Sequence, residues 1–150
     1  MRYVLLVLLL VIGVGCRKSE GEFDGREDIV QVSDTDSKMQ AAQQKARDTM
    51  DEFIGKLSNL KEAEAIVKWA APTDGGNQEH IWVEKVVFAD GKFTGNLANK
   101  PAAIEGKKIG DKVTFAKEDA SDWAIYYRDG RSEGGFTNKV LEEQEGKKGP

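Results

Sequence analysis

The 150-residue chain contains few of the residue types that build disulfides and metal sites. It has one cysteine and one histidine, which excludes an intramolecular disulfide, a CxxC-type zinc or redox site and a two-histidine metal site of the HExxH kind. No segment has the residue spacing of a calcium-binding loop. We therefore expect neither a bound metal nor another cofactor.

The chain also lacks an excess of positive charge. Lys and Arg number 22, Asp and Glu number 26, and the formal net charge is −4. Because binding to nucleic acid requires clustered cations, we expect no nucleic-acid partner. The length supports one domain rather than two.

The longest apolar run is too short to span a membrane. Residues 4–12 are apolar throughout, whereas a spanning helix needs about 20 such residues. A basic residue, Arg2, precedes this run, and small residues follow it at 13–15. This order is typical of a secretory signal peptide, which we assign to residues 1–15.

Cys16 directly follows these small residues and is the only cysteine. The arrangement resembles the lipobox of bacterial lipoproteins, in which the chain is cut before the cysteine and the thiol receives a diacylglycerol. Gly13 departs from the pattern, which prefers Leu there. The resemblance implies a palmitate-bearing lipoprotein of the cell envelope, anchored to the membrane at Cys16 and facing the periplasm or the exterior. A plain signal peptide with a chance cysteine and a short uncut anchor remain alternatives.

The mature chain divides into a tether, a domain and a tail. Residues 16–35 combine the modified cysteine with a charged segment that predicts a flexible tether. Ile29, Val30 and Val32 are the apolar exception, either a short strand or a docking segment. We assign the domain to 36–141 and a charged tail to 142–150.

An amphipathic helix is predicted over residues 36–60. Apolar residues recur there at steps of three and four, which places them on one stripe of a helix. Gly55 weakens the last turns. The stripe consists of Met39, Ala42, Ala46, Met50, Phe53 and Leu57.

The second half of the chain is rich in strand signals. β-branched and aromatic residues alternate in short runs, and Asp90-Gly91 and Asp129-Gly130 mark tight turns. A helix followed by such strands predicts an α+β fold, with the helix packed on a curved, mainly antiparallel sheet of five or six strands. A partly closed, barrel-like sheet is the alternative. The predicted strands are 65–69, 80–88, 93–97, 112–117, 122–128 and 132–136.

Five short motifs occur in a fixed order in this half. They read EHIWV at 79–83, FTGNLAN at 93–99, KIGDKV at 108–113, SDW at 121–123 and GGFT at 134–137. The ordered set resembles the bacterial DUF2314 family, a domain of unknown function. Phe136, where the family often has Tyr, and Lys139, where it tends to have Arg, depart from the pattern. The resemblance implies a domain and assigns no catalytic role.

His80 is the candidate for acid–base chemistry. On a strand, His80 and Trp82 share one face and Glu79 lies on the other. A cross-strand carboxylate such as Asp122 would orient the imidazole as a general base, which is the mechanism of a small hydrolase-like enzyme. The alternative is that His80 hydrogen-bonds across the sheet and fixes its register. We favour this alternative because no partner nucleophile is evident.

The candidate binding residues are aromatic side chains and a glycine pair. Trp82 and Trp123 belong to a residue type that is enriched at interaction hot spots. Gly134 and Gly135, next to Phe136, are small enough to let a ligand approach the backbone. The alternatives are a buried core for the indoles and a bulge or bend for the glycines.

The hypothesis that these observations favour is a non-enzymatic binding module. Cys16 would hold it to a membrane, and the sheet would present one face or edge to a protein partner. An inhibitor or immunity-like role is one specific version. The hydrolase with His80 as base is the competing class.

Overall fold

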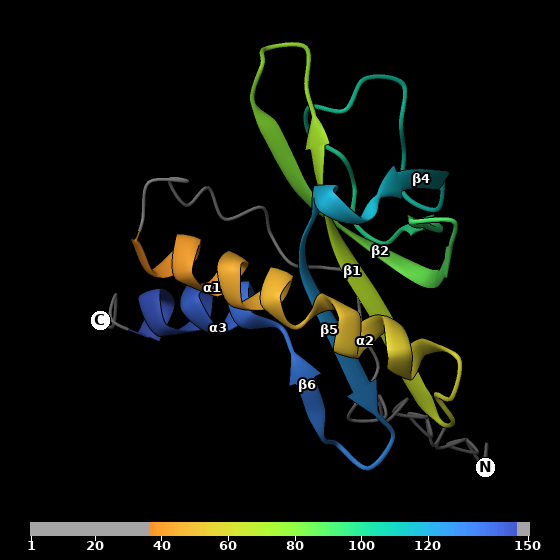
Figure 1. Cartoon of the computed structure of the whole chain (residues 1–150). Helices are drawn as coiled ribbons and strands as arrows, with labels where there is room; N and C mark the ends of the chain where they lie inside the picture. The colour runs from red at the N-terminus through yellow and green to blue at the C-terminus, as the bar shows by residue number, and fades with distance from the viewer. Residues whose placement is uncertain (1–36, 147–150) are drawn as a thin grey trace, which may run out of the picture.

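The computed structural model describes residues 37–146, so the signal peptide, Cys16 and tether assigned above lie outside the described residues. The described part consists of three helices, a short 3₁₀ turn and a six-stranded sheet (Figure 1). None of these helices is long and apolar enough to cross a bilayer. The helices are α1 (Ser37–Asp48), α2 (Met50–Leu57) and α3 (Phe136–Glu145). The strands are β1 (Ala63–Pro72), β2 (Gln78–Ala89), β3 (Lys92–Leu97), β4 (Lys112–Ala116), β5 (Ala120–Tyr127) and β6 (Ser132–Gly134).

The sheet is antiparallel throughout and has the strand order β4-β3-β2-β1-β5-β6. The predicted α+β class is confirmed. The barrel-like alternative is wrong, because the sheet remains open between its two edge strands, β4 and β6.

The predicted long helix is two helices. Thr49 separates α1 from α2, and its hydroxyl donates to the Lys45 carbonyl at 2.8 Å. A threonine side chain that bonds back to the preceding turn competes with the helical ladder and bends the helix. The indole of Trp123 donates to the same hydroxyl at 3.1 Å, so a contact with the sheet stabilises the break.

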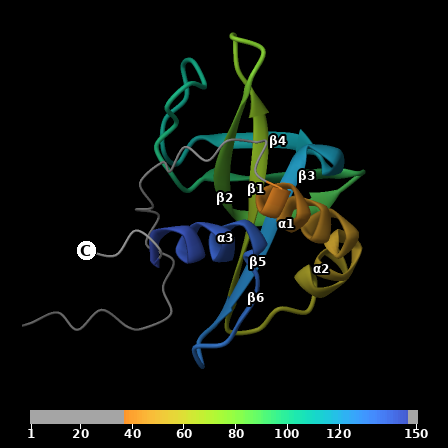
Figure 2. The same cartoon turned by 90° about the vertical axis from the view of Figure 1, so that its left-hand side faces the viewer.

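The two helices on either side of this break have different neighbours. Helix α1 lies beside α3 (Figure 2) and also contacts strand β5. Helix α2 packs on the sheet itself, where the Phe53 ring stacks on the Trp123 indole with centroids 5.0 Å apart. The predicted apolar stripe is buried at Met39, Ala42, Ala46, Met50 and Phe53.

The sheet buries apolar residues on both faces. The helix side, which faces α2, holds the larger core, including the Phe93 and Phe115 rings, which contact each other in a tilted arrangement. The smaller cluster on the opposite side contains Ile66, Trp82, Ala98 and Ala124. Successive side chains of the two central strands, β1 and β2, therefore point alternately into the two cores, because side chains alternate between the faces of a strand.

The predicted Asp90-Gly91 turn joins β2 to β3. Both residues have positive φ, 51° and 75°, which is the backbone of a two-residue type I′ hairpin. The amide of Lys117, the residue directly after β4, donates to the Gly91 carbonyl at 3.1 Å and connects the turn to the end of β4.

Candidate functional site

A row of polar and aromatic residues crosses the side of the sheet opposite α2. The strand registers align Lys68 of β1 with Trp82 of β2 on one flank and with Asp122 of β5 on the other. All three side chains are buried, and Asp122 is 0% exposed. Buried charged groups are costly unless they are paired and hydrogen-bonded, so their partners define what this row does.

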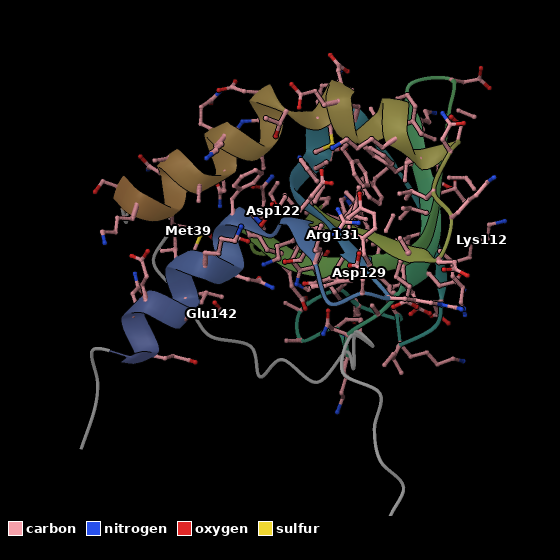
Figure 3. All side chains as sticks on the ribbon, turned by 90° about the horizontal axis from the view of Figure 1, so that it is seen from below. Met39, Lys112, Asp122, Asp129, Arg131 and Glu142 are labelled. Carbon is pink, nitrogen blue, oxygen red and sulfur yellow. The ribbon has the colours of Figure 1, made fainter. Side chains whose placement is uncertain are left out.

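Asp122 caps helix α3 from a neighbouring strand (Figure 3). Its Oδ2 accepts hydrogen bonds from the Thr137 amide at 2.8 Å and the Thr137 hydroxyl at 2.6 Å. Its Oδ1 accepts from the Phe136 amide at 3.3 Å and the Trp123 amide at 2.8 Å. The N-cap residue itself is Gly135 and has no side chain to serve this purpose. The carboxylate therefore satisfies amide groups that the helix leaves open at its start.

Two opposing effects act on the pKa of the Asp122 carboxyl. Burial is the largest effect and raises the pKa above its usual value, because desolvation disfavours the charged form. The Thr137 and Trp123 donors and the nearby Lys68 charge lower it. The net direction is upward.

Lys68 is held by the same helix. Its ammonium donates to the Thr137 hydroxyl at 2.8 Å and to the Asn138 side-chain oxygen at 2.9 Å. It also lies 4.4 Å from the centroid of the Trp82 ring, within cation–π range. The Thr137 hydroxyl thus links the Lys68 cation to the Asp122 anion, accepting from one and donating to the other.

His80 meets a partner other than the expected one. Its Nδ1 lies 2.8 Å from the hydroxyl of Ser121, which also reaches the Lys68 carbonyl at 3.3 Å. Glu79 lies on the other face, as expected, and its carboxylate accepts hydrogen bonds from the Ala102 and Ala103 amides in the loop between β3 and β4. The Asp122 carboxylate is used by α3, so the structure does not bring it to His80 as an orienting group.

A β-bulge explains why Ser121 reaches His80. The register of β1 against β5 shifts between Lys68 and Trp69, leaving Ser121 as the extra residue. A bulge changes the direction of a side chain within a strand. Regular alternation in the sequence gave no signal for this change.

The two candidate indoles are core residues. Trp82 is 2% exposed and Trp123 is 4% exposed. Trp123 contacts Phe53 on one side and meets the Phe136 ring edge-on, with centroids 5.7 Å apart. Neither indole is presented at the surface of the structure.

The glycine pair allows close packing and a sharp turn into α3. A Cβ on Gly134 would collide with the backbone oxygen and ring of Trp123, and φ is 72°. Gly135 has φ of 62° and its amide donates to the Trp123 carbonyl at 2.7 Å. The predicted bend therefore describes this pair, and Phe136, which follows it, packs against the core.

The sheet also contains a fork between β1 and β2, which was not predicted from the sequence. β1 and β2 pair only from Val67↔Val83 to Pro72↔Gln78. Beyond that point, residues 63–66 of β1 pair with β5 alone, and residues 84–89 of β2 pair with β3 alone. Within residues 37–146, the two facing strand edges have no strand partner beyond the last β1–β2 pair.

A bulge in β2 lies where the two arms of the fork, residues 63–66 of β1 and 84–89 of β2, diverge. The register against β3 shifts between Glu84 and Val87, and Lys85 in this bulge has φ of 54°. A Cβ on Gly95, opposite the bulge, would lie 2.5 Å from the Glu84 carbonyl oxygen. Glycine at 95 is therefore required for β2 to bend here. Positive φ at a lysine costs energy and such strain is concentrated at functional sites, which makes the fork a candidate site.

A cleft of about 270 Å³ lies in the fork. Three charged residues belong to its lining: Glu64 from one arm, and Glu84 and Lys85 from the other. The apolar part of the lining consists of Leu57, Leu60, Ala63, Ala65, Ile66 and Val86. No group of three or more metal-ligating side chains occurs within the described residues.

One motif could have indicated the fork. Gly95 interrupts a run of strand-forming residues in FTGNL at 93–97, and a glycine inside a strand often marks a bulge or a close backbone approach. The partner strand and the position of the gap follow only from the sheet register.

Comparison with known proteins identifies a family and two relatives whose names state no activity. The DUF2314 family model, described as an uncharacterized protein conserved in bacteria, matches residues 36–148. The uncharacterized protein YegJ of Escherichia coli strain K12 is 36% identical over 92 residues, which are 61% of this chain and 59% of YegJ. A Neisseria meningitidis serogroup B protein named for ankyrin repeats is 31% identical over 71 residues, 47% of this chain and 28% of that protein. The chain thus spans less than two thirds of either relative. No solved structure matches it.

Proposed function

Since the chain belongs to the DUF2314 family of uncharacterized bacterial proteins, we propose that it is a binding module of the cell envelope rather than an enzyme. In this proposal the acylated Cys16 holds the domain to a membrane, and the domain engages a protein partner. The anchor rests on the sequence alone, because residue 16 lies outside the described part of the chain.

One observation supports binding over catalysis. The Lys68 and Asp122 side chains on the side of the sheet opposite α2 are engaged in fixing α3, whereas the fork leaves two strand edges without a strand partner beside a cleft, within the described residues. Buried polar networks of this kind fix a structure when every member is satisfied. An open strand edge is instead a template for another chain.

The hydrolase alternative is not supported, because the Asp122 carboxylate is not available to orient His80. A histidine general base requires an orienting partner and a substrate proton within reach. Asp122 is engaged by α3, and the Ser121 hydroxyl that lies beside the His80 ring belongs to a residue that is 3% exposed. The geometry therefore favours a structural role for His80.

The anchor is tested by metabolic labelling with a palmitate analogue. We expect label on the natural chain and none on Cys16→Ser, with the labelled protein in the membrane fraction. Absence of label from the natural chain would refute the anchor.

The binding role is tested in cells with a photo-reactive amino acid. It is introduced singly at exposed positions spread over the described surface. We expect at least one position to give a cross-linked adduct of discrete mass, and a complete set without adducts would refute the binding role. The positions are Val87, Asp90, Lys100, Ile109 and Glu118.

A further inference from the structure

We propose that the fork between β1 and β2 docks an extended segment of a partner polypeptide, with an apolar side chain in the cleft and a basic residue beside it. This inference rests on the proposed binding function and names its site and the chemistry of its partner. It depends on three features: the backbone edges, the cleft and the charges on its wall.

The backbone of β1 faces the fork at defined positions. The Arg128 amide donates to the Glu62 carbonyl at 3.1 Å, which extends the β1–β5 ladder by one bonded pair. Bonded and non-bonded pairs alternate in an antiparallel ladder, so even-numbered residues of β1 bond to β5. Ala63 and Ala65 therefore direct their amide and carbonyl groups into the fork. The turn between β1 and β2 leads to the same conclusion. The Thr73 amide donates to the Asn77 carbonyl there, so odd-numbered residues of β1 face β2.

An extended polypeptide is the occupant that matches these groups. It offers donors and acceptors at the repeat of a strand, as in recognition by strand addition. A lipid chain has no such groups, and a sugar does not have them at this spacing. The cleft volume of about 270 Å³ lies just below the roughly 300–1,000 Å³ of small-molecule pockets. It suits one or two side chains of such a segment.

The charges on the wall indicate a basic partner residue. Lys85 Nζ lies 3.4 Å from Glu84 Oε1, so this ammonium is already paired with one of the two carboxylates. Glu64 is exposed, and no cation pairs with it among residues 37–146. The cleft thus carries one uncompensated negative charge, which a Lys or Arg of the partner would neutralise.

The probe is a library of 12-residue peptides displayed on phage and selected on the full chain in detergent micelles. We expect enrichment of sequences with alternating apolar residues and an adjacent Lys or Arg. A synthetic peptide from this selection is then added to the chain, and amide exchange is followed residue by residue.

Amide exchange gives a signature that a nonspecific contact would not produce. The amides of Ala63 and Ala65 should exchange at least about tenfold more slowly with the peptide bound, because they gain a partner. The amides of Glu64 and Ile66 already bond to β5 and should change little. Protection confined to the outer edges of β4 or β6, or none at all, would overturn the inference.

Paired variants test the edge directly. Ala65→Pro removes the amide that faces the fork and leaves the β1–β5 bonds intact, since proline is tolerated where its nitrogen faces an open edge. We expect it to weaken peptide binding at least about tenfold, or roughly 1.4 kcal/mol. Ala65→Ser keeps the amide and should bind within about twofold of the natural chain. Glu64→Gln should weaken binding and reduce its dependence on salt.

The outcomes separate this inference from the proposed function. If Ala65→Pro fails to fold, the exchange pattern of the natural chain decides. Unchanged peptide binding by a folded Ala65→Pro would overturn the fork as the site, while cellular adducts would still support a binding module. Fork-dependent peptide binding without any cellular adduct would support the fork and refute the proposed role in the envelope.

Discussion

Replacement of Asp122 by alanine is expected to destabilise the domain more than any surface substitution. The change removes four hydrogen bonds and leaves three backbone amides without their acceptor, at Trp123, Phe136 and Thr137. Each buried donor left without a partner costs about 1–3 kcal/mol, and partial relaxation offsets some of this cost. The Lys68 ammonium also loses its nearby anion. We expect a total loss of about 3–5 kcal/mol in the free energy of unfolding, the range for breaking a buried charge pair.

Urea unfolding followed by circular dichroism measures this loss as a lower midpoint at constant slope. Asp129→Ala is the matched control. Its carboxylate pairs with Arg131 at the surface, where solvent screens the pair and its contribution to stability is small. A loss for Asp122→Ala no larger than that of the control would refute the assignment of Asp122 as the cap of α3.

The raised pKa of Asp122 adds a dependence on pH. Because burial makes its ionisation harder in the folded than in the unfolded state, the stability that this group contributes is complete below about pH 4 and declines as pH rises through the folded pKa. Asparagine does not titrate. The destabilisation by Asp122→Asn should therefore be larger at about pH 4 than at about pH 7. An equal or opposite difference would show that the hydrogen bonds, not burial, dominate the pKa.

Two further substitutions test the packing around this cap. Gly134→Ala should destabilise the domain by at least about 2 kcal/mol more than Gly130→Ala, since both glycines have positive φ but only Gly134 lies against Trp123; equal thermal midpoints would contradict the close approach. Lys68→Met should cost about 2–4 kcal/mol in urea unfolding, because it removes the cation beside Asp122 and its contact with the Trp82 ring. An unchanged free energy of unfolding would show that the Lys68 contacts are energetically neutral.

Periodic features of the sequence predicted most of the fold. The helical stripe from Met39 to Phe53 and the alternating run around Val113 and Phe115 are signals that a buried face imposes directly on the chain. The Asp90-Gly91 hairpin was predictable because only a few residue types adopt positive φ in consecutive positions. The break at Thr49 was not, because the Trp123 indole that contacts it lies 74 residues away.

The candidate site was predicted less well than the fold. The shared face of His80 and Trp82 follows from strand alternation, but the partner of His80 depends on a bulge at Ser121 that shifts the register. Similarly, the position of Asp122 in the SDW motif suggested a catalytic role. Its observed role depends on helix α3, which begins 14 residues later and packs with its first residues against Asp122.

The amino-acid sequence was sufficient to predict the class of this protein: one α+β domain with a sheet of short strands and an apolar helix stripe, and membership of a family without assigned chemistry. These features are local, because side-chain periodicity and turn residues act over a few positions of the chain. Two features became apparent only in the folded chain: Asp122 caps α3, and β1 and β2 separate to form a fork. Both depend on which distant backbone groups come together, and strand register and bulges, not composition, set that pairing.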